Sequence, residues 1–232
     1  KSVALSGVEA GQTAISKVGS NGKELHYRGY DIHDLALHAT FEEVAFLLVH
    51  GNLPNGYELA RYRQKLESMR GLPAPVKAVL EAIPTAANPM DVLRTGCSVL
   101  GTVLPEREDQ ITSEARNIAD RLLASLPSML VYWYHFARNG LRIELDLDDD
   151  SIAGHFLHLL YGRKAQHSFV RALDVSLIMY AEHEFNASTF TGRVITGTGS
   201  DMYSAICGAI GALRGFKHGG ANEGAHDLIE RF

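Results

Sequence analysis

The chain has 232 residues, 46% of them hydrophobic and 21% charged. A chain of this length buries roughly 70% of its unfolded surface, so its core needs no disulfide or metal, and the composition excludes disordered, collagen-like and coiled-coil proteins. The formal net charge of −5, from 22 Lys and Arg against 27 Asp and Glu, argues against a protein that binds nucleic acid through a general positive field.

The first 30 residues are the only part whose pattern favours β-structure. Short extended runs occupy residues 3–6, 13–16 and 25–28, and Asn21-Gly22 is a typical turn pair between the last two. We expect a small hairpin-like segment over residues 1–30, followed by a helical domain over residues 31–232.

Helical periodicity begins at Asp31. Thr40 and Glu43 form a capping box, and the helix that they open is expected to end near Gly51. Further helices are expected from Pro54 to near Gly71, from Pro73 or Pro75 to Ile83, over residues 89–103, 112–138, 151–161, 166–185 and 201–214, and after Gly220 to the end of the chain. Pro127 should bend or break the longest of these.

Two loop segments carry possible functional signals. Residues 144–150 are rich in carboxylates but lack the Gly and terminal Glu of a calcium loop, which favours a solvated linker. Residues 197–200 contain a G-x-G, but no strand precedes it, so a loop in which Ser200 or Asp201 caps the next helix is the better interpretation. Strands and helices do not alternate, which argues against a doubly wound nucleotide-binding fold.

Cysteine usage and hydropathy give expectations about location. Cys97 and Cys207 lie in separate apolar stretches and form no Cys-x-x-Cys motif, so we expect two reduced thiols and a cytoplasmic protein. Apolar runs fall short of the roughly 18 residues of a membrane span, and no membrane partner is expected.

The histidines offer one possible metal site. His155 and His158 share a helical face, with His167 nearby. That spacing suits a metal ion, but no Glu or Cys cluster completes it, and we expect no metal.

A first polar patch follows the apolar run that ends near Tyr180. His183 and Glu184 look like the start of a zinc-protease helix, but Ala187 stands where H-E-x-x-H needs the second His. Polar groups at the end of a buried helix need partners. A substrate anion and a satisfied structural network both remain open at this point.

A second polar patch is His218 followed by Gly219 and Gly220. The glycines leave backbone N–H groups open to a ligand just before a helix, and the helix N-terminus disfavours an imidazolium. A neutral imidazole there can donate a hydrogen bond to a developing enolate. The alternative is a Gly-rich turn with an incidental His.

The two patches together resemble the citrate synthase superfamily. Residues 180–189 read YAEHEFNAST and residues 218–223 read HGGANE, and the likeness extends to residues 7–15, GVEAGQTAI, and 25–32, LHYRGYDI. The first of these runs, with residues 132–135, YWYH, is most similar to the 2-methylcitrate synthases within that superfamily.

The resemblance implies a mainly α fold, with a helical large domain that runs toward a smaller helical domain, and a homodimer. It also implies condensation of propionyl-CoA with oxaloacetate and water, giving 2-methylcitrate and CoA in propionate catabolism. The CoA thioester is a substrate, and no cofactor is implied. A citrate synthase that uses acetyl-CoA is the first alternative, and a non-catalytic helical fragment that dimerises or binds a partner is the second.

Site residues follow from the resemblance position by position. His218 corresponds to the catalytic His that stabilises the acyl-CoA enolate, and Ser188 to the residue that orients it. His183 corresponds to a His that holds oxaloacetate, Asn186 is a candidate for the same pocket, and Ser68 lies in a segment that resembles one lending a substrate contact.

Two departures from the family pattern stand out. Residues 215–217 read GFK, where the family usually has Gly-Pro, which can loosen the turn before His218. The family also has a Gly-His-x-x-Tyr-type motif, a catalytic Asp and carboxylate-binding arginines that this sequence lacks, so we expect the 232-residue chain by itself not to turn over.

The apolar run over residues 205–213, AICGAIGAL, predicts a helix buried on every side. Its small residues let another helix approach closely. A homodimer is expected, with burial inside one monomer as the alternative.

Overall fold

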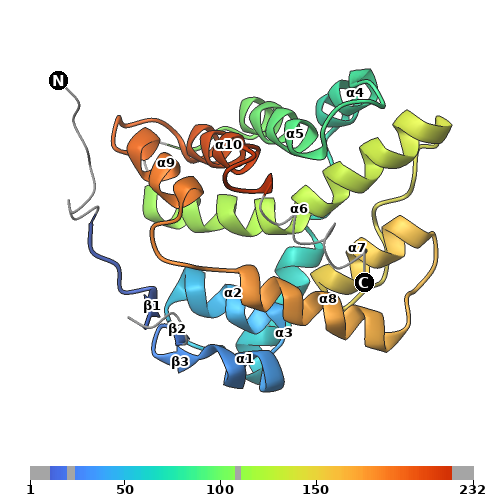
Figure 1. Ribbon diagram of the computed structural model, residues 1–232. Helices are drawn as coiled ribbons and strands as arrows, with labels where there is room; N and C mark the ends of the chain where they lie inside the picture. The colour runs from blue at the N-terminus through green and yellow to red at the C-terminus, as the bar shows by residue number, and fades with distance from the viewer. Residues whose placement is uncertain (1–10, 20–23, 108–110, 221–232) are drawn as a thin grey trace.

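The computed structural model describes residues 11–19, 24–107 and 111–220, and Figure 1 shows how their elements are arranged. The elements follow one another as β1 (Ser16–Val18), β2 (Leu25–Tyr27), β3 (Tyr30–Asp31), α1 (Ile32–His38), α2 (Phe41–His50), α3 (Gly56–Glu67), α4 (Ala74–Ala82), α5 (Pro89–Val103), α6 (Ile111–Asn139), α7 (Ile152–Tyr161), α8 (His167–Tyr180), α9 (Ala187–Thr196) and α10 (Met202–Leu213). The expectation of a mainly α fold with a short N-terminal β segment is confirmed.

The three strands form one antiparallel sheet in the order β1-β2-β3. Ser16 lies opposite Tyr27, and Tyr27 lies opposite Tyr30. The first strand begins later than expected, because the Ile15 N–H bonds the Thr13 hydroxyl, a local turn that ends just before Ser16. The expected strand at residues 3–6, the Asn21-Gly22 turn and the helix after Gly220 lie outside the described residues.

Local capping signals set the ends of the early helices. The Glu43 carboxylate accepts from the Thr40 N–H at 2.7 Å and from the Thr40 hydroxyl at 2.8 Å, which confirms the capping box. Gly51 ends α2 with a left-handed φ of 103°. The next helix begins at Gly56 and not at Pro54, because the Asn55 side chain caps its first turn.

The longest helix, α6, runs unbroken through Pro127. Figure 1 shows that its direction changes along its length, as expected of a helix with an internal proline. It packs against α4, α5 and α10 on one side and against α2, α3 and α7 on the other. This helix therefore separates two hydrophobic clusters, one centred on residues such as Leu100, Met129 and Trp133, the other on Tyr27, Leu47 and Ile178.

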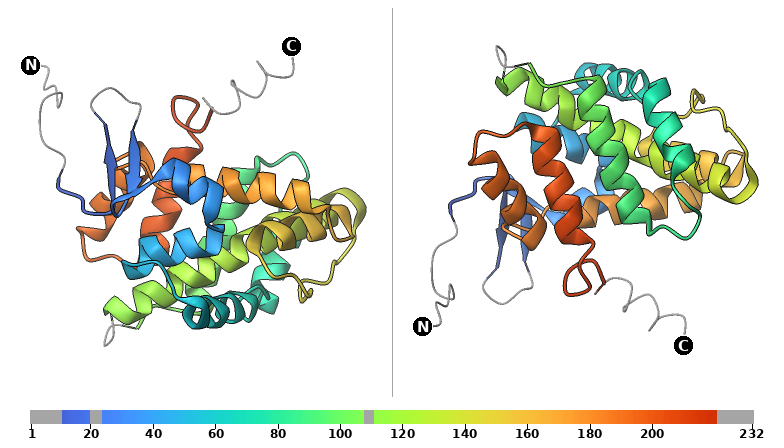
Figure 2. Two further views of the ribbon diagram at one scale, coloured as in Figure 1. Left: turned by 90° about the horizontal axis from the view of Figure 1, so that it is seen from below. Right: turned by 90° about the horizontal axis from the view of Figure 1, so that it is seen from above.

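The helix expected over residues 166–185 ends at Tyr180, and a separate helix, α9, occupies Ala187–Thr196. The expectation fails because Glu184 has a left-handed φ of 56° and Asn186 caps a new helix with its side chain. Residues 181–186 are therefore a connection between two helices. Both views of Figure 2 show the blue strands beside the orange segment that contains α9.

Candidate active site

The site begins where α8 ends, in contact with Tyr27 of the N-terminal sheet. The Tyr27 hydroxyl donates to the Ile178 carbonyl at 3.0 Å and accepts from the Glu182 N–H at 3.3 Å. Burial raises the pKa of Tyr27, so its hydroxyl stays neutral and keeps the proton that it donates. One buried side chain thus ties the last turn of α8 to the connecting segment.

The connecting segment leads into α9, which packs closely against α10. A Cβ atom added at Gly208 of α10 would overlap the Ile195 side chain of α9. The small residues of α10 therefore allow α9 of the same chain to pack closely against it. The expectation that α10 is buried on every side is wrong for the single chain, since Ile206, Cys207 and Ala209 are only half-buried.

A tight turn follows α10 and carries His218. The His218 N–H bonds the Gly215 carbonyl at 2.9 Å, and the Gly219 N–H bonds the Leu213 carbonyl at 3.0 Å. The Gly220 N–H also points to the Gly215 carbonyl, at 3.4 Å. The expectation that the glycine N–H groups stay open to a ligand is therefore wrong.

The glycine at 219 is required for a different reason. A Cβ atom at this position would overlap the carbonyl oxygen of Leu213, which is backbone and cannot move aside cheaply. Gly219 lets the chain fold back onto the end of α10.

Ser188, in the first turn of α9, meets the imidazole of His218. Its hydroxyl oxygen lies 2.9 Å from His218 Nε2, and both side chains are half-buried. A serine hydroxyl that donates to Nε2 leaves the imidazole proton on Nδ1. In that tautomer the Nδ1–H of His218 can donate a hydrogen bond to a substrate oxygen.

Comparison with known proteins identifies the family of this chain. Residues 4–232 match the family model described as "Citrate synthase, C-terminal domain". The chain belongs to the citrate synthase family.

Individual citrate synthase relatives cover most of the chain. It is 57% identical over 226 residues to the 2-methylcitrate synthase of Shewanella oneidensis, a match over 97% of this chain and 60% of that protein. The crystal structure of citrate synthase from Thermotoga maritima is 35% identical, with a TM-score of 0.82 over 98% of this chain and 59% of that one. Citrate synthase from Thermoplasma acidophilum, a ternary complex with carboxymethyl coenzyme A and oxaloacetate, is 29% identical with a TM-score of 0.87.

The chain spans 60% of the length of the Shewanella relative and 59% of each of the two structures.

The remaining residues expected in the citrate synthase site lie in different settings. His183 is exposed in the connecting segment. The Asn186 side-chain oxygen accepts from the Thr189 N–H at 3.0 Å, so it serves as a helix cap. The Ser68 hydroxyl, at the end of α3, donates to the Lys65 carbonyl at 2.7 Å. In the part of the chain that the structure describes, Ser68 makes no hydrogen bond to the other candidates.

The anchoring role of Tyr27 is not predicted from sequence. Tyr27 and Ile178 are separated by 151 positions, and no local pattern links them. The carboxylates of Glu182 and Glu184, on either side of His183, are the signal that this segment needs polar partners.

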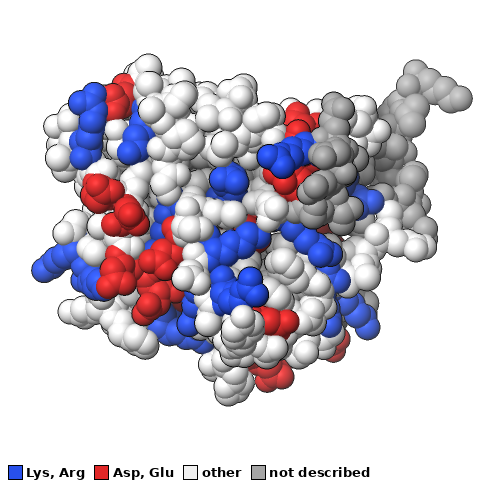
Figure 3. Space-filling view, turned by 180° about the vertical axis from the view of Figure 1, so that it is seen from behind, with Lys and Arg blue, Asp and Glu red and all other residues white. Residues whose placement is uncertain are grey.

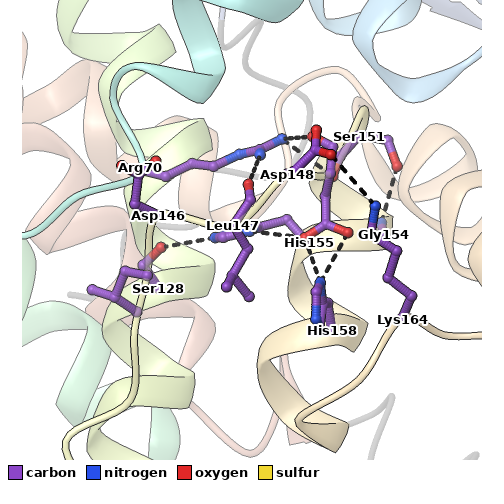
Figure 4. Close-up of polar contacts among 12 residues, drawn as sticks. Arg70, Ser128, Asp146, Leu147, Asp148, Ser151, Gly154, His155, His158 and Lys164 are labelled. Atoms are coloured by element: carbon purple, nitrogen blue, oxygen red, sulfur yellow. Dashed lines mark hydrogen bonds and ion pairs between the residues drawn. The ribbon is translucent and has the colours of Figure 1, made fainter.

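His155 and His158, two of the three histidines whose spacing suits a metal ion, lie in a separate cluster around Asp149. His158 Nδ1 lies 2.9 Å and His155 Nδ1 3.5 Å from Asp149 Oδ2, and the Ser128 hydroxyl lies 3.4 Å from His155 Nε2. Figure 4 shows Ser128, His155 and His158 gathered at this point. Among the described residues, no three candidate ligands are placed to hold a metal ion.

Residues 144–150, the acidic segment before α7, pack partly against the same cluster. The buried Arg70 guanidinium donates to the Asp149 carbonyl at 2.7 Å and to the Leu147 carbonyl at 3.3 Å (Figure 4). Leu145 is buried in the core as well. This segment therefore links α6 to α7 with its alternate residues Glu144, Asp146, Asp148 and Asp150 exposed, as expected of a solvated linker, while the residues between them dock on the helices.

Surface charge and helix hydropathy add two observations. On the face seen in Figure 3, acidic side chains gather toward the left of the view and basic side chains gather beside them toward its centre. Within the described ranges, no helix combines the length and the apolar character needed to cross a membrane.

Proposed function

We propose that the full-length protein that carries this sequence condenses propionyl-CoA with oxaloacetate and water to give 2-methylcitrate and CoA. The observation that carries the proposal is the hydrogen bond of 2.9 Å between Ser188 and His218 in a citrate synthase fold. The 57% identity to a 2-methylcitrate synthase supports the choice of acyl-CoA.

His218 acts on the thioester in this proposal. Ser188 donates to Nε2, so Nδ1–H is free to donate to the thioester carbonyl oxygen. A base removes a proton from the acyl α-carbon, and the oxygen gains negative charge as the enolate forms. The imidazole stabilises that charge through a hydrogen bond placed in advance, which is effective where water is excluded. The resemblance to the family implies an Asp as this base.

His183 binds the second substrate in this proposal. The enolate carbon attacks the ketone carbon of oxaloacetate and forms the new C–C bond, while the ketone C=O π bond opens to an alkoxide that takes up a proton. Water then hydrolyses the thioester to the carboxylate and releases CoA. The exposed His183 donates a hydrogen bond to oxaloacetate and holds it for this attack. Asn186 caps the end of α9 that carries Ser188, and in this proposal it forms part of the wall of the oxaloacetate pocket.

The test is a comparison of kcat/KM for propionyl-CoA and acetyl-CoA, measured on the full-length protein with oxaloacetate. One methylene in a pocket changes specificity by about 1–3 kcal/mol, so activity with both substrates is expected, with propionyl-CoA preferred. A clear preference for acetyl-CoA would favour the citrate synthase alternative. No turnover with either would favour a non-catalytic fragment.

A homodimer and a cytoplasmic location complete the proposal. The half-buried flank of α10, with Ile206 and Ala209, supports a contact with a second copy. The free thiols of Cys97 and Cys207 support a reducing compartment. Light scattering at micromolar concentration is expected to give a dimer, and a monomer would contradict this part of the proposal.

A further inference from the structure

His183 sits between two glutamates that are both held by the N-terminal sheet. Glu182 Oε1 accepts from the Ser16 hydroxyl at 3.0 Å, and the Glu184 N–H donates to the same hydroxyl oxygen at 3.1 Å. Glu184 Oε1 accepts from the Val18 N–H at 3.0 Å. The residues before and after His183 are thus fixed to β1, while the imidazole itself stays exposed.

Ser16 is the centre of this arrangement. Its side chain is buried, with 8% of its surface exposed, and its single hydroxyl serves a carboxylate and a backbone amide that lie two positions apart. Hydrogen bonds to a charged group in such a place are stronger than neutral ones. The hydroxyl therefore determines the path of the backbone through His183.

Backbone strain at Glu184 is a second observation that the N-terminal sheet holds this segment in place. Glu184 has a φ of 56°, a left-handed conformation that costs a residue with a Cβ free energy. Such strain persists only where surrounding contacts hold it, and it gathers at functional sites. The contacts to Ser16 and Val18 are what hold Glu184 in this conformation, which turns the chain directly after His183.

We infer that Ser16 and Glu184 are positioning residues for His183, so that the N-terminal sheet sets where oxaloacetate is bound. The inference rests on the proposed role of His183. It assigns a function in the site to a strand that is separated by 166 positions from the segment that it holds.

The test uses steady-state kinetics of the full-length protein. Ser16→Ala is expected to raise the KM for oxaloacetate about tenfold, because a hydrogen bond to a charged group is lost. We expect kcat to change far less and the KM for propionyl-CoA to stay as in the wild type. Ser16→Thr keeps the hydroxyl and is expected to restore the oxaloacetate KM. Ser176→Ala is the matched control, because the one hydrogen bond of the Ser176 hydroxyl within the described part of the chain goes to the Ala172 carbonyl of α8.

Glu184 gives a second, independent variant. Glu184→Gly removes both the strain and the side chain that bonds the Val18 N–H, so a purely structural role predicts a changed unfolding temperature without a selective change in the KM for oxaloacetate. Positioning predicts a higher oxaloacetate KM despite the relief of strain. Glu184→Gln keeps an acceptor for the Val18 N–H and is expected to resemble the wild type.

The outcomes separate this inference from the proposed function. If His183→Ala raises the oxaloacetate KM while Ser16→Ala and Glu184→Gly do not, the positioning role is overturned and the proposed function stands. If His183→Ala leaves that KM unchanged, the role of His183 fails and the inference fails with it. A lower unfolding temperature with both KM values raised and no rescue by Ser16→Thr would indicate a merely structural role and would also overturn the inference.

Discussion

The Ser188 hydroxyl lies 2.9 Å from His218 Nε2, although the two residues are 30 positions apart. They meet because α9 and α10 pack antiparallel at close range, with Gly208 leaving room for Ile195. The chemistry of the proposed site depends on this contact, because a hydroxyl that donates to Nε2 leaves the imidazole proton on Nδ1.

Replacing each histidine should separate the two proposed roles. His218→Ala is expected to lower kcat by the equivalent of about 3–4 kcal/mol, the usual effect of removing a donor to a developing oxyanion, with little change in the KM for oxaloacetate. His183→Ala should mainly raise that KM. Steady-state kinetics on the full-length protein measure both, and the reverse pattern would show that the roles are assigned wrongly.

Removing the Ser188 hydroxyl should act through His218. Ser188→Ala is expected to lower kcat about tenfold, because a lost hydrogen bond of this kind changes the energy by about 1 kcal/mol or somewhat more. Thr191→Val is the control in the same helix, since among the residues that the structure describes the Thr191 hydroxyl bonds the Ala187 carbonyl and no other group. Equal kcat values for Ser188→Ala and wild type would mean that the contact does not orient the catalytic imidazole.

The turn that carries His218 should tolerate no side chain at Gly219. Gly219→Ala is expected to displace the turn and lower kcat, because the new Cβ atom would overlap the Leu213 carbonyl oxygen. Gly56→Ala is the matched control, since a Cβ atom there has nothing within 4 Å. Circular dichroism monitors folding of both variants, and wild-type kcat in Gly219→Ala would contradict the expected displacement.

Stability should fall in mild acid because of His155. Burial, helped by the Arg70 charge, lowers the pKa of His155 from 6.5 to about 4. Between these values the unfolded chain binds more protons, so the His155 contribution is complete above about pH 6.5 and is lost as the pH falls toward 4. Over this pH range the contribution of His155 to the free energy of unfolding changes by at most about 3 kcal/mol.

Urea unfolding at several pH values, for wild type and His155→Gln, measures this contribution. Burial raises the pKa of Glu42, which acts in the opposite direction, so the readout is the difference between the two proteins. We expect a shallower fall in stability for His155→Gln, with the exposed His33→Gln as the control. Parallel pH curves for wild type and His155→Gln would contradict the prediction.

Local chemistry in the sequence determines most of the helical framework. The Thr40–Glu43 capping box, the glycine after α2 and the cap at Asp201 each act within four residues, so sequence patterns predict them. The two histidine patches are also local in sequence, and they indicate the family through their resemblance to the citrate synthases.

Only the tertiary structure decides how those patches are assembled. The pairing of Ser188 with His218, the attachment of residues 178–184 to the N-terminal sheet and the docking of residues 147–149 on Arg70 all join distant parts of the chain. The N–H groups of Gly219 and Gly220, which the sequence alone suggests are available to a ligand, donate hydrogen bonds within the turn after α10. Sequence patterns fail here because hydrogen bonds between distant residues depend on how whole helices pack, and local propensity carries no information about that packing.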